Sequence, residues 1–138
     1  MSFLRIVSLS DDETAGSKLF NEHGICLYIE HGDNRILFGT GASALFLSKA
    51  ERLGVPTDKS DTVILPLNSD DITGGVETAV RKNKDLRIFI REDAATDCAK
   101  KEKLLRVRNG LPQSFYKSDK YNIFRFERFT EICVCQLL

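Results

Sequence analysis

The 138-residue sequence is 42% hydrophobic and 29% charged, a balance typical of one globular domain with its own core. Its formal net charge is zero, which gives no electrostatic reason to expect nucleic acid or an anionic membrane as a partner. No run of 18 apolar residues occurs, so no transmembrane helix is expected. The first residues turn acidic without a signal-like apolar stretch, so we expect a cytoplasmic protein.

Charge is unevenly distributed along the chain. Residues 1–80 carry 6 basic and 12 acidic side chains, whereas residues 81–128 carry 14 basic and 7 acidic ones. Two interpretations stay open: two solvated faces of opposite sign, or a polar molecule that pairs head to tail or binds an acidic or phosphorylated partner.

The chain has four cysteines and two histidines: Cys26, Cys98, Cys133, Cys135, His23 and His31. No two of the cysteines form a CxxC pair, and so few histidines make a Cys/His zinc site unexpected. We therefore predict reduced, buried, structural cysteines.

The first third of the chain predicts strands followed by a helix. Residues 3–8 form a first strand, and a polar loop leads to a hairpin at 24–38 whose turn is Gly-Asp-Asn at 32–34. A helix is expected over 43–53, with Ser43 as N-cap and one buried stripe that ends at Leu53.

The rest of the chain alternates further strands and helices. We expect strands over 61–67, 86–90, 121–126 and 132–138, helices over 74–83 and 93–105, and a turn over 109–112. This order predicts an α/β layered domain with a mixed sheet.

Residues Gly39–Ala44 match the G-x-G-x-x-A pattern in which glycine-rich backbone holds a pyrophosphate at a helix N-terminus. The preceding strand, however, is the second arm of a hairpin. Asp61 also stands at the start of the next strand, whereas a ribose-binding carboxylate belongs at its end. A tight turn into a helix is the simpler interpretation, and phosphate or nucleotide binding by the amides of this loop stays an alternative.

A polar loop follows the strand at 61–67, and its pattern resembles H-x-H-x-D-H-x-G-G of the metallo-β-lactamase superfamily. The metal-binding positions of that motif fall on Leu67, Ser69, Asp71 and Ile72, and its glycines fall on Gly74 and Gly75.

The resemblance extends over most of the chain in motif order and spacing. The F-D-T-G turn of the superfamily falls on residues 38–41, with Gly39 in place of aspartate. Residues 22–24, 50–54 and 129–132 resemble the branch that contains dihydropterin-type synthases and uncharacterised metal-dependent hydrolase-like proteins. The resemblance implies half of an αββα sandwich, with a mixed sheet and helices on one face.

The resemblance also implies an ancestral zinc or iron site, which we predict to be lost. Leucine and isoleucine have no lone pairs to donate, and a neutral serine is a poor ligand, so only Asp71 keeps a ligand type. A weak ion held by Asp70 and Asp71 stays an alternative, and we expect His23 at the surface or beside a ligand position rather than as a ligand itself. No catalytic residue and no cofactor are predicted.

Members of the superfamily continue into a second half, so residues 1–138 are expected to form a single truncated domain with one sheet face exposed. We therefore expect a homodimer through that face, without nucleic acid or membrane as a partner. The predicted function is a non-catalytic, metal-free binding or interaction protein. The alternatives are a divergent metal-dependent hydrolase completed by a partner chain, a small phosphate- or nucleotide-binding protein, and a decayed or frameshifted gene product.

Overall fold

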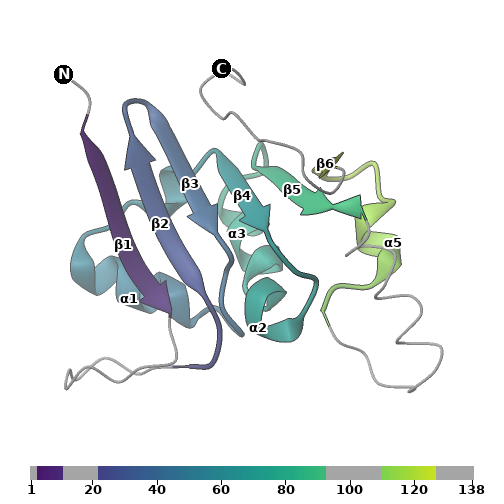
Figure 1. Cartoon of the computed structure of the whole chain (residues 1–138), viewed down its shortest axis with the longest axis horizontal. Helices are drawn as coiled ribbons and strands as arrows, with labels where there is room; N and C mark the ends of the chain where they lie inside the picture. The colour runs from purple at the N-terminus through teal and green to yellow at the C-terminus, as the bar shows by residue number, and fades with distance from the viewer. Residues whose placement is uncertain (1–2, 11–21, 93–109, 127–138) are drawn as a thin grey trace.

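The computed structural model describes residues 3–10, 22–92 and 110–126, and within them six strands form one mixed sheet (Figure 1). The strands are β1 (Leu4–Ser10), β2 (Cys26–His31), β3 (Asn34–Phe38), β4 (Thr62–Leu65), β5 (Arg87–Arg91) and β6 (Asn122–Phe126), and their order in the sheet follows the chain. The first three strands pair antiparallel, and the β3–β4, β4–β5 and β5–β6 pairs are parallel. The predicted mixed α/β sheet is confirmed.

Helices connect the parallel strands and lie on one face of this sheet. The described helices are α1 (Leu45–Leu53), α2 (Asp70–Thr73), α3 (Val76–Lys82), α5 (Gln113–Tyr116) and the 3-10 helix η1 (Thr57–Lys59). Figure 1 shows α1 and α3 behind the sheet and α2 at its lower edge, beyond the end of β4. No helix in the described ranges is long and apolar enough to cross a membrane. The predicted helix 93–105 and strand 132–138 lie outside the described residues.

The β2–β3 hairpin has the predicted alternation. Ile29 stands opposite Ile36 on one face, while Tyr28 and Leu37 are paired on the other and are almost fully buried. Gly32 turns the chain with a φ of 58°, a left-handed conformation that glycine adopts without a steric penalty.

Helix α1 starts later than predicted. It begins at Leu45, and Ala44 rather than Ser43 occupies the N-cap position, although the Leu45 amide donates to the Ser43 hydroxyl at 3.1 Å. Leu53 is also 45% exposed, because the left-handed Gly54 reverses the chain and brings Val55 into the core instead.

The predicted helix over 74–83 is α3, and a further short helix, α2, precedes it. Residues expected to be loop form α2, in which the Ser69 carbonyl accepts from the Ile72 and Thr73 amides. The chain then passes Gly74 and Gly75 before α3 begins. A Cβ on Gly74 would lie 2.0 Å from the Ala42 carbonyl oxygen, so two loops meet here backbone to backbone.

The core lies between the sheet and the helices. Tyr28, Leu37, Val63 and Ile88 line its sheet side in register, and Phe46 from α1 packs against the same cluster. Burial of these side chains removes apolar surface from water and is the main stabilising contribution to the fold.

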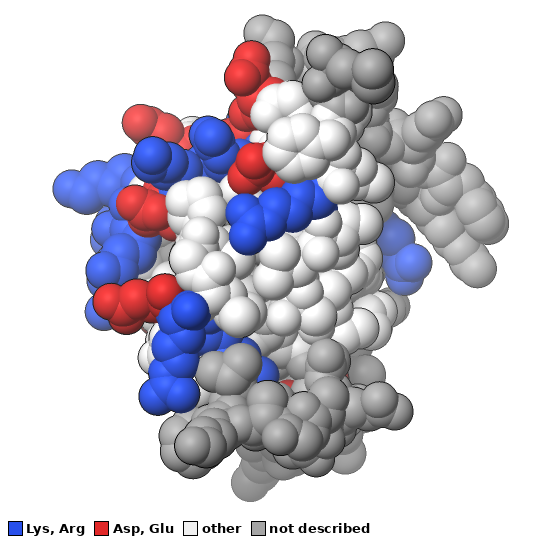
Figure 2. Space-filling model, turned by 90° about the vertical axis from the view of Figure 1, so that its left-hand side faces the viewer, with Lys and Arg blue, Asp and Glu red and all other residues white. Residues whose placement is uncertain are grey.

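The opposite face of the sheet carries an uncharged row that crosses all six described strands. Cross-strand pairing aligns Ser8, Leu27, Phe38, Ile64, Phe89 and Phe124, which we call the open-face row. Phe89 stacks on Phe124 with ring centroids 5.0 Å apart. At the edges of this face Ile6 is 56% exposed and Phe124 is 45% exposed. In Figure 2 charged side chains gather toward the helical side, and the sheet side is largely white.

Replacement of Gly74 by alanine tests the close approach of the two loops. We expect G74A to destabilise the protein by about 2–3 kcal/mol, because the new methyl group must displace backbone. The control is G54A, where φ is 66° but no atom lies within 4 Å of the added Cβ, and there we expect a loss of about 1 kcal/mol. Urea unfolding followed by circular dichroism measures both, and an equal loss in the two variants would contradict the contact.

Cys26 is buried, as predicted, and is a free thiol. Cys98, Cys133 and Cys135 lie outside the described residues, so for them the prediction is untested. Burial raises the pKa of its thiol from 9.0 to about 12, with the Glu22 carboxylate adding to the rise and Lys49 opposing it. We expect peptide mapping after iodoacetamide treatment at about pH 8.5 to find Cys26 unmodified in the native protein and modified in urea. The same shift lowers stability as pH rises from about 9 toward 12, because only the unfolded thiol ionises there. Rapid modification of Cys26 in the native protein would contradict the burial of its thiol.

Candidate functional site

The loop after β4 carries the degenerate motif and meets two other segments. Its Gly74 amide donates to the Gly41 carbonyl in the loop after β3 at 3.0 Å, and Asn68 contacts the segment before α5. Parallel strands β3 and β4 end at the same edge of the sheet, which is where α/β folds commonly place ligand sites.

The four motif positions lie in different environments. The Leu67 side chain is 54% exposed, and Ile72 is 4% exposed and belongs to the hydrophobic core. The Ile72 carbonyl is used internally, since it accepts from the Thr40 amide at 2.8 Å and from the Thr40 hydroxyl at 2.7 Å. Leu67 therefore lies at the surface, and Ile72 contributes to core packing.

Asp71 is the one motif position with a ligand-type side chain, and it is engaged by neighbours. Its Oδ1 accepts a hydrogen bond of 2.5 Å from the Ser69 hydroxyl, and its Oδ2 lies 3.6 Å from Nε2 of His23. The structure thus brings Ser69, Asp71 and His23 together. His23 was expected at the surface or beside a ligand position, and its exposed imidazole lies next to Asp71, a partner that the sequence did not name.

Asp70 points to a different partner from Asp71. Its Oδ1 accepts from the Gly110 amide at 2.7 Å. A cavity of about 340 Å³ lies beside this contact, and Asp70 and Glu77 are the carboxylates among its lining residues. The two adjacent aspartates therefore have separate partners, and the weak hard-ion site with Asp70 and Asp71 stays a prediction.

The donor set does not fit the metal centre that the motif implies. Catalytic zinc sites use three protein ligands and structural ones use four. Within 3–10, 22–92 and 110–126 no group of three or more His, Cys, Asp or Glu side chains could hold a metal ion. Among the motif positions Asp71 supplies the one carboxylate, and the His23 imidazole lies nearby.

Asn68 fastens the motif loop to the segment before α5. Its Oδ1 accepts from the Leu111 amide at 2.9 Å and from the Tyr116 hydroxyl at 2.7 Å, and its Nδ2 donates to the Leu111 carbonyl at 3.1 Å. Gly110 passes so close that a Cβ there would lie 2.4 Å from Oδ1 of Asn68. These three bonds to one side-chain amide fix the loop backbone without a ligand.

The loop over residues 39–43 has no amide left for a phosphate. The amides of Gly39, Thr40 and Gly41 donate to backbone carbonyls at 2.8–3.0 Å. The amides of Ala42 and Ser43 both donate to Oε1 of Glu22 at 3.1 Å. Glu22 thus supplies a carboxylate where the pattern would place a phosphate, and nucleotide binding by this loop stays an untested alternative.

Sequence reasoning missed the roles of Glu22 and Asn68. Both are polar residues next to glycine-rich turns, but their partners lie 20 and 43 residues away in the chain. Side-chain bonds to distant backbone produce no local periodicity. Residues 22–24 entered the sequence analysis only as a resemblance, without a role for Glu22.

Comparison with known proteins gives similarity in structure alone. No protein-family model matches the sequence, and no curated protein matches it. Tm1679, described as a metal-dependent hydrolase of the β-lactamase superfamily, is 28% identical with a TM-score of 0.52, over 67% of this chain and 32% of that chain. The FEZ-1 metallo-β-lactamase from Legionella gormanii is 9% identical with a TM-score of 0.59, over 78% of this chain and 42% of that chain.

A further similar structure is a Thermotoga maritima protein classed with the metallo-β-lactamases. It is 16% identical with a TM-score of 0.58, over 95% of this chain and 62% of that chain. The chain thus spans about a third to three fifths of the length of these three proteins. Assignment to the branch of the dihydropterin-type synthases stays a prediction. The structure confirms the resemblance at the level of architecture: the chain has the fold of the metallo-β-lactamase superfamily.

Proposed function

We propose that this chain is a non-catalytic interaction protein that pairs with a second copy of itself through the open face of its sheet. The observation that carries the proposal is the open-face row, which is uncharged on every described strand and opposite the helices. Solvent-exposed side chains at both edges of this face, Ile6 and Phe124, lose unfavourable contact with water when a second sheet covers them.

A second copy is a suitable partner for two physical reasons. Sheets pack face to face by interdigitating their apolar side chains, and an identical sheet has the same twist and row spacing. The open-face row has no charge of its own, so covering it desolvates no ion of the row. Arg87 and Arg91 flank Phe89 at alternate positions of β5, and Arg87 lies 3.5 Å from Asp61. A partner with a strongly charged surface would gain little from this face.

The proposal also rests on the chemistry of the motif positions. The side chains of Leu67 and Ile72 have no atom that can ligate a metal. The neutral Ser69 hydroxyl donates a hydrogen bond to Asp71, and a neutral hydroxyl is a poorer ligand than an anion. The metal-dependent hydrolase remains the second candidate, favoured by the 28% identity to the hydrolase Tm1679. In that case a partner chain would supply the missing ligands around Asp71.

Matched lysine substitutions test the dimer. Phe124 on the open face and Leu53 on helix α1 are both 45% exposed, so F124K and L53K place a charge at sites of equal accessibility. We expect light scattering to give twice the chain mass of 15.6 kDa for the parent protein, and F124K to weaken association about tenfold or more. L53K should have the affinity of the parent.

Two results would overturn the dimer proposal. One is a parent mass of 15.6 kDa at about 100 μM, well above the dissociation constant expected of a stable homodimer. The other is equal weakening by L53K and F124K, which would place the interface elsewhere or indicate a general loss of stability.

Metal analysis separates the two candidates. For the interaction protein we expect zinc, iron and manganese far below one ion per chain after purification, and no change in that content in D71N. Stoichiometric metal that is lost in D71N and H23A, but retained in the control H31A, would instead support the hydrolase. His31 is a suitable control because it ends β2, away from the motif loop.

A further inference from the structure

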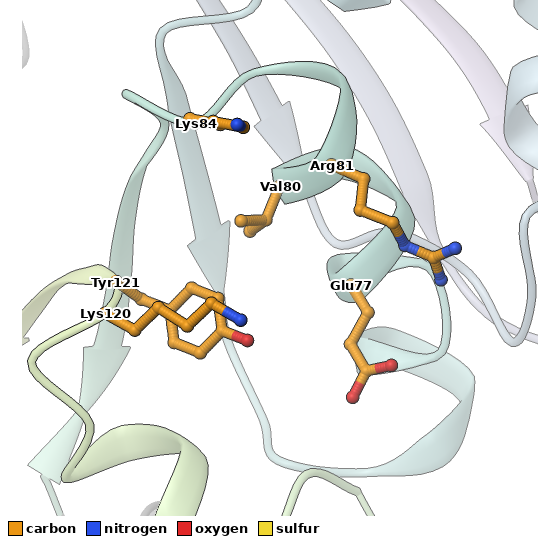
Figure 3. A pocket seen from close by; sticks show the side chains of 6 residues that line it. All are labelled: Glu77, Val80, Arg81, Lys84, Lys120 and Tyr121. Carbon is orange, nitrogen blue, oxygen red and sulfur yellow. The ribbon is translucent and has the colours of Figure 1, made fainter.

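A second hollow lies between the end of α3 and the start of β6, and none of the degenerate motif positions lines it. Its volume is about 520 Å³, and its lining residues are Glu77, Val80, Arg81, Lys84, Lys120 and Tyr121 (Figure 3). This volume lies within the range of small-molecule sites, which run from about 300 to 1,000 Å³. The hollow therefore has room for a small organic ligand.

Three cations from two distant segments line this pocket. Arg81 and Lys84 come from the end of α3 and the turn after it, and Lys120 comes from the residue pair that precedes β6. None of the three forms an ion pair with a carboxylate of the described residues. Glu77 is the single acidic residue of the lining, so the pocket has a net charge of +2. Such a surplus of unpaired positive charge favours an anion.

The pocket also has an aromatic wall that the core holds in place. Tyr121 stacks on Phe115 with ring centroids 4.4 Å apart, and Phe115 meets Tyr116 edge to face at 5.5 Å. Tyr116 is in turn anchored through its hydroxyl to Asn68. The Lys120 amino group lies 5.8 Å from the Tyr121 ring centroid, and Figure 3 shows both groups on the same side of the pocket. Phe115 therefore covers one face of the Tyr121 ring and the Lys120 amino group lies over the ring, so a planar ligand contacts Tyr121 by displacing this lysine side chain.

We propose that this pocket binds a small organic phosphate whose planar ring lies on Tyr121 and whose phosphate meets Arg81, Lys84 and Lys120. Arginine matches phosphate by paired N–H donors, and lysine adds a point charge. An aromatic ring gives a second, charge-independent contact for a planar group. Residues 81–128 have an excess of basic side chains, and one open interpretation of this excess was an acidic or phosphorylated partner. The proposed phosphate ligand agrees with that interpretation. This site is independent of the open face and goes beyond the proposed pairing.

Isothermal titration with AMP tests the proposal, with inorganic phosphate and adenosine as partial ligands. We expect AMP to bind more tightly than either part, because each part makes only one of the two contacts. The double variant R81A/K84A should weaken AMP binding about tenfold or more, since it removes two charged partners of the phosphate. The control R52A/K59A removes the same charge from exposed positions on α1 and η1 and should bind AMP as the parent does.

Each other outcome overturns the proposal in a defined way. Equal affinity for AMP and inorganic phosphate would show that the ring makes no contact with the protein. Equal weakening of AMP binding by both double variants would show that the effect depends on net charge and not on this pocket. Unchanged AMP binding in R81A/K84A would place the ligand elsewhere, and no heat of binding at about 10 mM AMP would exclude the site. Circular dichroism of both double variants establishes that they are folded, so that loss of binding reports on the pocket.

Discussion

Two loops meet backbone to backbone at the ends of β3 and β4, and the rest of the site depends on this contact. Thr40 is at its centre: its amide and hydroxyl donate to the Ile72 carbonyl, and its hydroxyl oxygen accepts from the Gly75 amide. The contact determines where α1 begins on one side and where α2 gives way to α3 on the other. Glu22 adds a carboxylate that gathers the amides at the start of α1. A metal ion can hold such loops by ligand bonds, and here hydrogen bonds and close packing do so.

Much of the architecture could be predicted because burial imposes a period on the sequence. The hairpin, the parallel strands and the buried part of α1 each have enough residues for an alternation or a helical stripe to be read. The four-residue helices α2 and α5 have no such period, because one turn forms mostly from tertiary contacts. Leu53 was misassigned because its stripe position says nothing of the chain reversal at Gly54, which replaces it with Val55 in the core.

The sequence predicted the chemical character of the site residues, but it predicted few of the contacts between them. The residue types at positions 67, 69 and 72 are enough to question metal binding, since they depend on ligand chemistry alone. The bonds of Asn68 to Leu111 and Tyr116 depend on how the chain returns to the same edge of the sheet. The pocket between α3 and β6 combines Arg81 with Lys120, which only the β5–β6 pairing brings together. Fold similarity adds no activity to these observations, because one fold supports many functions.

Burial of Ile72 makes a metal ligand at this position costly. A histidine at this position would bring a polar ring into a site that is 4% exposed and surrounded by apolar side chains. Without a metal such a ring has no compensating bond there, and without the other ligands the metal does not bind. Each single step back toward a metal centre therefore lowers stability before it adds any affinity. A metal centre in this loop would need several ligands introduced together, because the present packing at Ile72 opposes each single change.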